Sequence, residues 1–137
     1  MSQVDRYLEN KAMDHIDHAL GRPVDPLAET YRNYFYVIGD TDLRRDMAAS
    51  PHWRGDGKGG EGEYFVVTNE GRAALSAHLK AIGDKHRRWI ASYAGYEMEV
   101  IATSAAKARY SKWLAISDVN ESLTFGEFQR NSKVRAA

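Results

Sequence analysis

The sequence RGDGKGGEG at residues 54–62 is the feature that most constrains how this chain folds. Five glycines in nine residues disfavour a helix here, because glycine loses more conformational freedom on ordering than any other residue. The segment runs directly into EYFVV at residues 63–67, whose aromatic and β-branched side chains predict a strand. We therefore predict a β-hairpin with a mobile glycine-rich tip and with residues 63–67 as its second strand.

Three elements are predicted upstream of this hairpin. Apolar residues recur every four positions between residues 4 and 20, which predicts a helix that ends at Gly21. The aromatic and β-branched run at residues 31–38 predicts a strand. Asp40 or Thr41 can cap a short helix that stops before the next proline.

Two elements follow the hairpin directly. Thr68 can cap a helix that carries apolar side chains on one face and ends at Gly83. Residues 88–102 then alternate between apolar and polar side chains on either side of a turn near residues 94–96. This alternation predicts a second β-hairpin.

The last part of the chain predicts two helices. Ser104 can cap the first, whose inward stripe is expected to be Ala106, Tyr110, Trp113, Leu114 and Ser117. Thr124 and Glu127 form a capping box, so a short final helix is expected to begin at Phe125. Together these elements predict an α+β fold, with one unit over residues 1–83 and a ββαα module over 84–137, packed as one compact domain.

Composition narrows the function classes. Nineteen basic and nineteen acidic residues cancel, although residues 1–40 are net acidic and residues 84–137 are net basic. The chain lacks cysteine, so it has no thiolate metal site, disulfide or cysteine nucleophile. Neither a leader-like amino terminus nor a membrane-spanning apolar run is present, so a cytoplasmic location without a membrane partner is expected.

The first half of the chain resembles winged-helix proteins. The residues that carry the likeness are the glycine-rich tip, which resembles a wing, and the segment YFVVTNEGRAAL at residues 64–75. In that superfamily the last strand of the wing leads through such a turn into a helix. Only one helix fits between residues 38 and 54, where a helix-turn-helix has two. A truncated winged helix with a missing or reduced recognition helix is therefore expected.

The sequence also resembles small uncharacterised proteins encoded by bacteriophages and prophages. The segments that carry this likeness are HALGRP at residues 18–23, YRNYF at 31–35, VTNEGRAAL at 67–75 and KARY at 107–110. The resemblance implies a phage protein acting in the host cell. Proteins of this kind and size include transcriptional regulators, inhibitors of host defence such as anti-CRISPR proteins, and minor virion components.

No motif in the sequence specifies catalysis. His15 and His18 lie three residues apart on the first predicted helix and can face one metal ion, but no further ligand pair completes a recognised motif. No serine lies in a nucleophile elbow, and Lys58 does not stand in a phosphate-binding loop. We therefore expect a protein that is not an enzyme and that needs no cofactor or metal.

Charged residues supply the candidate binding sites. The residues expected to contact nucleic acid are Arg54 and Lys58 at the wing tip, and Arg87, Arg88, Lys107, Arg109 and Lys112 in the basic module. Asp14 and Asp17 belong to an acidic helix face that is expected to dock a basic host partner.

The function expected from these features is that of a noncatalytic, phage-encoded accessory or regulatory protein that binds nucleic acid. The alternative is an inhibitor of a host defence complex that acts by protein contact, or a minor virion component. The sequence leaves open the target, the choice between DNA, RNA and protein, and whether the chain forms homo-oligomers.

Overall fold

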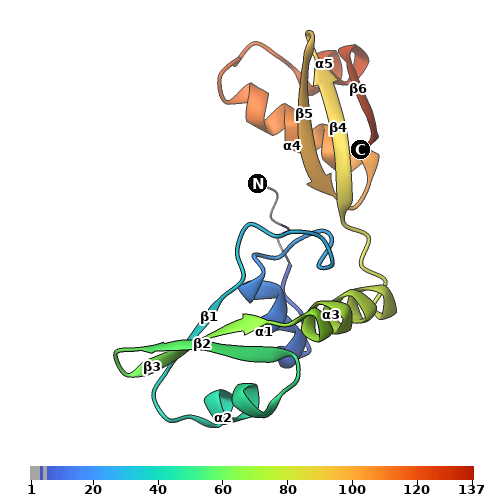
Figure 1. Cartoon of the computed structure of the whole chain (residues 1–137). Helices are drawn as coiled ribbons and strands as arrows, with labels where there is room; N and C mark the ends of the chain where they lie inside the picture. Colours follow the sequence, from blue (N-terminus) through green and yellow to red (C-terminus); the bar gives the residue numbers. More distant parts are fainter. Residues whose placement is uncertain (1–3, 5) are drawn as a thin grey trace. The chain divides into compact units, whose positions relative to one another are not determined.

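The computed structural model describes Val4 and residues 6–137. The described residues up to Asp84 form a first compact unit, and Lys85–Ala137 form a second, a division one residue beyond the predicted boundary. The described part of the chain is α+β, with five helices and two three-stranded antiparallel sheets (Figure 1). None of its helices is long and apolar enough to cross a bilayer. Each unit has its own hydrophobic core.

The first unit consists of three helices and one sheet. Its elements are α1 (Lys11–Ala19), β1 (Phe35–Ile38), α2 (Asp42–Ala49), β2 (Trp53–Gly59), β3 (Gly62–Val67) and α3 (Asn69–Ala81). The strand order is β1-β3-β2, so the second strand of the glycine-rich hairpin lies in the middle of the sheet. Residues of all three helices share one core with the inward side chains Val37, Trp53, Phe65 and Val67.

The helix predicted over residues 4–20 begins only at Lys11, so the first part of that prediction is wrong. Asn10 caps the helix, its side-chain oxygen accepting the amide hydrogen of Met13. Upstream, the amide of Leu8 donates to the carboxylate of Asp14, so the chain is fixed by tertiary hydrogen bonds before the helix starts. Val4 and Leu8 are nevertheless buried. Before Lys11 the four-residue spacing of apolar residues therefore indicates which side chains are buried, and it does not indicate a helix.

The glycine-rich segment is a strand rather than a mobile tip. Residues up to Gly59 belong to β2, and the chain turns only at residues 60–61 before β3 begins. A register shift between Gly55 and Lys58 marks a β-bulge opposite Tyr64. The hairpin is therefore confirmed, but four of the five glycines lie within its two strands and only Gly60 lies in the turn.

The second unit contains one sheet and two helices. Its elements are β4 (Arg87–Tyr93), β5 (Tyr96–Ala102), α4 (Ala105–Ser117), α5 (Phe125–Asn131) and β6 (Ser132–Ala136). The predicted β4–β5 hairpin is confirmed, and β4 is the central strand of the order β5-β4-β6. Strand β6 was not predicted, and the module is ββααβ instead of ββαα. A short strand with two basic residues at a sheet edge carries no hydrophobic pattern that identifies it.

The predicted inward stripe of α4 is wrong. Ala108 is fully buried against the sheet of the second unit, whereas Tyr110 and Leu114 are about half exposed. The ring of Trp113 packs against Phe125 of α5, with ring centroids 5.4 Å apart. A small side chain lets the helix approach the sheet closely, and the large rings pack on one another outside that contact.

Candidate nucleic-acid interface

The sheet of the first unit has one face turned away from its core, which we call the outer face. Alternation along β1 and β3 places Tyr36 and Tyr64 on this face, directly opposite each other in the register. Their ring centroids are 4.7 Å apart, and the ring of Tyr34 lies 6.4 Å from that of Tyr64. Tyr34 is 51% exposed and Tyr64 is 41% exposed. These three tyrosines form the tyrosine face.

Two glycines make room for these rings. A Cβ atom on Gly62 would lie 2.5 Å from the ring of Tyr36 and 2.4 Å from the backbone oxygen of Val37. A Cβ atom on Gly59 would lie 3.2 Å from the ring of Tyr64. The Tyr36 hydroxyl reaches across the sheet and donates to the backbone oxygen of Gly59 at 2.5 Å. The glycine-rich hairpin is thus the floor on which the tyrosine rings lie.

An asparagine fastens the start of this face. The side-chain amide of Asn33 accepts the Val67 amide hydrogen at 2.7 Å and donates to the Val67 carbonyl at 3.0 Å. It therefore satisfies both backbone groups of Val67 as a paired strand would, and it fixes Arg32 and Tyr34 beside the sheet. The asparagine thereby extends the face to Tyr34, the residue immediately before β1.

An arginine lies at each of two hollows beside the tyrosines. A hollow of about 210 Å³ is lined by Arg32 and Tyr34, among others, and one of about 530 Å³ is lined by Arg54 and Val66. The Arg32 guanidinium donates to the backbone oxygen of His18, and it lies 5.9 Å from the ring centre of Tyr34. Arg54 is exposed, opposite Val66 in the register, and forms no ion pair among the described residues. Arg54 can therefore meet a ligand on the outer face, and Arg32 lies beside Tyr34 in a hollow that His18 and Phe35 also line.

The structure does not bring Arg54 and Lys58 together as predicted. Arg54 lies opposite Val66 on the outer face, whereas Lys58 lies opposite Glu63. Glu63 is on the inner side of the sheet, where it pairs with Arg44 of α2 at 3.2 Å. The bulge between Gly55 and Lys58 changes the alternation and places the two cations on opposite faces.

The five predicted cations of the second unit do not form one surface. Lys112 is only 7% exposed, and burial lowers the pKa of its ammonium group. Arg109 donates to Ser132 at 3.2 Å, and Lys107 is exposed on the first turn of α4.

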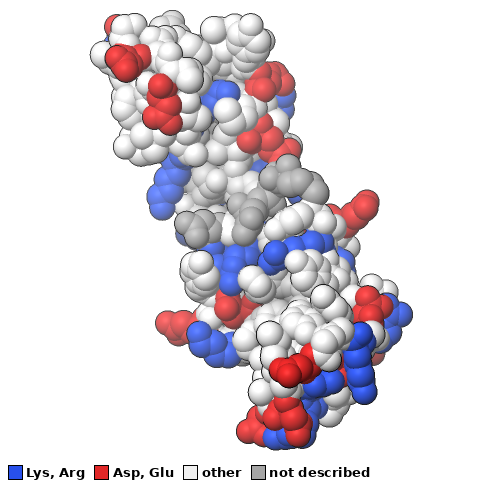
Figure 2. Space-filling model, turned by 90° about the vertical axis from the view of Figure 1, so that its left-hand side faces the viewer, with Lys and Arg blue, Asp and Glu red and all other residues white. Residues whose placement is uncertain are grey.

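Arg87 and Arg88 are neighbours on β4, so their side chains point to opposite faces of that sheet. Arg87 packs over the ring of Trp89 at 5.0 Å, and Arg88 pairs with Glu99 at 3.2 Å. On the face drawn in Figure 2, basic and acidic side chains are interspersed. Arg87 and Arg88 therefore do not contribute to one shared charged surface.

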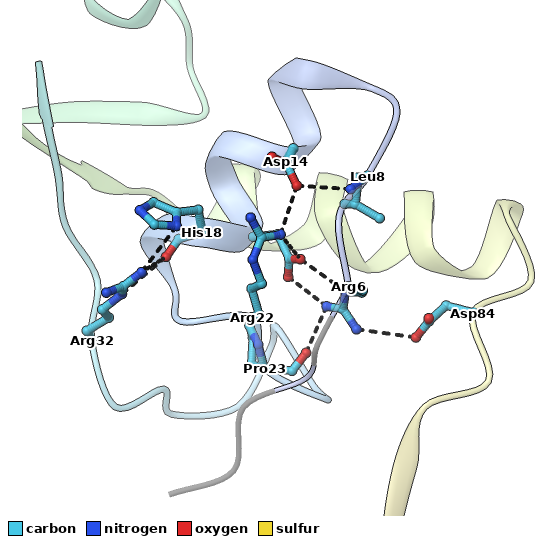
Figure 3. Close-up of polar contacts among 9 residues, drawn as sticks. Arg6, Leu8, Asp14, His18, Arg22, Pro23, Arg32 and Asp84 are labelled. Carbon is cyan, nitrogen blue, oxygen red and sulfur yellow. Dashed lines mark hydrogen bonds and ion pairs between the residues drawn. The ribbon is translucent and has the colours of Figure 1, made fainter. Parts of the chain in front are cut away.

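The predicted acidic docking face is part of an internal ion network (Figure 3). Asp17 has no exposed area and accepts hydrogen bonds from Arg6 at 2.6 and 3.0 Å and from Arg22 at 3.0 Å. Arg22 also donates to Asp14 at 2.8 Å, and Arg6 pairs with Asp84 at 3.3 Å. Asp17 therefore has no surface to offer a partner, because it is fully buried and its carboxylate is engaged by two buried arginines.

The same network sets the ionisation of Asp14. Burial raises the pKa of this carboxyl, but the hydrogen bonds from Arg22 and the Leu8 amide, with the charges of Arg22 and Lys11, outweigh that effect. The pKa of Asp14 therefore lies below its usual value. Asp14 stabilises the loop before α1 in its ionised form.

His15 and His18 pack on an aromatic ring. Both imidazoles lie edge-on to Phe35, with ring centroids 5.2 and 5.8 Å away. Burial lowers the pKa of both groups below the usual value for histidine. Among Val4 and residues 6–137, no three histidine or carboxylate side chains are placed to hold one metal ion. The contacts of the pair are those of side chains at the edge of a core.

Sequence reasoning missed the tyrosine face, although a signal was present. Tyr34 and Tyr36 alternate with Phe35 and Val37, and in a strand this spacing places the tyrosines together on the face opposite the core. Comparison with protein-family models, curated proteins and solved structures finds no match to this chain.

Proposed function

We propose that this protein is a noncatalytic nucleic-acid-binding accessory or regulatory protein, encoded by a phage and acting in the host cytoplasm. The observation that carries the proposal is the tyrosine face of the first sheet with Arg32 and Arg54 beside it. The phage origin rests on the sequence likeness described above, carried by segments such as VTNEGRAAL at residues 67–75.

Exposing aromatic rings to water costs free energy. Tyr34 and Tyr64 together leave much of their ring surface open to water, on a sheet whose other face is packed. A gathering of exposed aromatic side chains is typical of an interaction surface. Nucleic acid fits this one because tyrosine rings stack on bases and arginine binds phosphate.

The first unit is proposed to be a truncated winged helix. Support comes from the β2–β3 hairpin, from the central place of β3 in the sheet, and from α3, which follows β3 directly after the Thr68 cap. Between β1 and β2 the described chain has the single helix α2. We therefore assign binding to the outer face of the sheet and not to a recognition helix.

The alternative proposal is an inhibitor of a host defence complex that acts by protein contact. Its predicted surface is lost, because Asp17 is buried and Asp14 is engaged by Arg22. Such an inhibitor would have to use another surface, such as the tyrosine face. The nucleic-acid proposal is favoured because Arg54 stands exposed beside exposed rings.

Fluorescence anisotropy with labelled oligonucleotides at 50 mM and 200 mM salt tests the proposal. We expect salt-sensitive binding that Arg54→Gln weakens. The variant should also make the slope of log K against log salt less steep by about one. Arg45→Gln is the matched control, because Arg45 is an exposed arginine of the same unit that pairs with Asp40 and Asp42. Absence of binding to every DNA and RNA form at low salt, or equal effects of the two variants, would refute the proposal.

A further inference from the structure

We infer that the ligand of the tyrosine face is single-stranded nucleic acid whose bases stack on Tyr34 and Tyr64. This inference rests on the proposed function and specifies its substrate class. It is argued from how the rings are held, how much of each is open, and how few cations stand beside them.

Contacts with the glycine-rich hairpin hold the rings of Tyr36 and Tyr64 in place. Tyr36 lies over Gly62, and its hydroxyl is bound to the backbone oxygen of Gly59. Tyr64 lies beside Gly59 and against Tyr36, with an angle of 47° between the two ring planes. The ring of Tyr36 is thereby fixed, and it supports the more exposed ring of Tyr64. A stacking surface that is already fixed loses little entropy when a base binds.

A duplex does not match this surface. In duplex DNA or RNA the flat faces of the bases are covered by their neighbours, and a protein reads base edges with an element that enters a groove. The tyrosine face is the broad side of a three-stranded sheet, and its aromatic side chains come from β1, from the residue immediately before β1, and from the adjacent strand β3. Unpaired bases expose the ring faces that such a platform binds.

The cations set the expected length and salt response. Arg32 lies within 6 Å of the Tyr34 ring centre, and Arg54 is exposed opposite Val66, the next outer-face residue of β3 after Tyr64. Two phosphate contacts predict a slope of log K against log salt of about −1.4 for a single strand. This response is shallow, so stacking has to supply much of the affinity.

The test compares four labelled probes of equal length: single-stranded DNA of mixed sequence, the same sequence as RNA, the matched DNA duplex, and an abasic deoxyribose-phosphate strand. We expect one or both natural single strands to bind at least about tenfold tighter than the duplex and the abasic strand, because only they present unpaired bases. Comparing the affinities for the single-stranded DNA and RNA probes identifies which of the two the protein prefers.

Three leucine variants locate the stacking, two on the tyrosine face and one as a control in the second unit. Tyr64→Leu is expected to weaken single-strand binding about 5- to 150-fold, the range for loss of one stacked base. Tyr96→Leu removes a tyrosine of the second unit that is 76% exposed, and it is expected to change binding less than twofold. Tyr34→Leu tests the contribution of a second tyrosine of the face, at a residue outside the strands. Thermal melting shows whether each variant is folded.

Equal affinity for the single strand and the duplex would overturn the single-strand inference while leaving nucleic-acid binding in place. So would undiminished affinity for the abasic strand, or equal effects of Tyr64→Leu and Tyr96→Leu. Failure of every probe to bind would instead refute the proposed function itself. The two failures are therefore distinguishable in one set of titrations.

Discussion

Replacing Asp17 by asparagine removes the negative charge at the centre of the buried ion network. The carboxylate accepts three hydrogen bonds from Arg6 and Arg22, and each of these three side chains is at most 7% exposed. An amide of the same shape cannot accept all three hydrogen bonds, and it removes the counter-charge that the two guanidinium groups share, leaving Arg22 with Asp14 and Arg6 with Asp84. Breaking a buried pair in this way typically costs about 3–5 kcal/mol. That loss is a large part of the total stability of a small protein.

Urea denaturation followed by circular dichroism measures this loss. With a slope of about 1.5 kcal/mol per M, Asp17→Asn is expected to lower the midpoint of the first unit by about 2–3 M. Asp46→Asn, at an exposed position of α2 in the same unit, is expected to change stability by less than about 0.5 kcal/mol. The triple variant Arg6→Met/Asp17→Leu/Arg22→Met is expected to recover part of the loss, because it removes both arginines together with the carboxylate that they share, while Asp14 loses its bond from Arg22. A midpoint for Asp17→Asn equal to that of Asp46→Asn would refute the reasoning.

Three further predictions concern stability. Gly62→Ala should destabilise the first unit, because its new Cβ would meet the neighbouring backbone. Gly126→Ala in α5 should instead raise the free energy of unfolding by about 0.5–1 kcal/mol, because its new Cβ would lie 3.4 Å from a flexible arginine tip. The two variants are expected to shift the urea midpoint in opposite directions. Burial lowers the pKa of His15 and His18, so the unfolded chain takes up protons first and stability should fall as pH drops below about 6.5 through the folded-state pKa values. Melting at pH 7.5 and 5.0 checks this, and a pH response unchanged in His15→Gln/His18→Gln would contradict it. Lys112→Met should raise the melting temperature at pH 7 by removing a buried ammonium group, and a lower melting temperature would show that the charge stabilises the fold.

Local signals in the sequence predicted the starts of four helices. Thr41, Thr68, Ser104 and Thr124 each accept a backbone amide hydrogen from the first turn of the helix that follows. The β4–β5 hairpin was predicted equally well, because period-two alternation and a tight turn are also local. Features set by neighbours in sequence were therefore readable from the sequence alone.

Features set by distant contacts were not readable in the same way. The start of α1 depends on Asp14 accepting the Leu8 amide, and the burial of Asp17 depends on two arginines from outside its helix. The bulge that separates Arg54 from Lys58 follows from pairing with β3. Sequence spacing alone therefore predicted binding surfaces for charged residues that are buried or lie on different faces in the folded chain.

The candidate site illustrates the same division. Alternation was sufficient to place Tyr34 and Tyr36 on one side of a strand, but Tyr64 joins them only through the register of β1 with β3. The glycines that the sequence suggested were a mobile tip are the floor beneath these rings, since Gly62 lies under Tyr36. The role of the glycine-rich segment was visible only once its pairing was known.

Chemical-shift mapping by NMR tests the central claim most directly. The protein labelled with ¹⁵N is titrated with an unlabelled single-stranded oligonucleotide of mixed sequence, and the amide shifts are followed residue by residue. We expect the largest changes at Tyr34, Tyr64, Arg54 and their neighbours on the outer face of the first sheet. Changes confined to residues 85–137, or none at saturating oligonucleotide, would contradict the assignment of nucleic-acid binding to the tyrosine face.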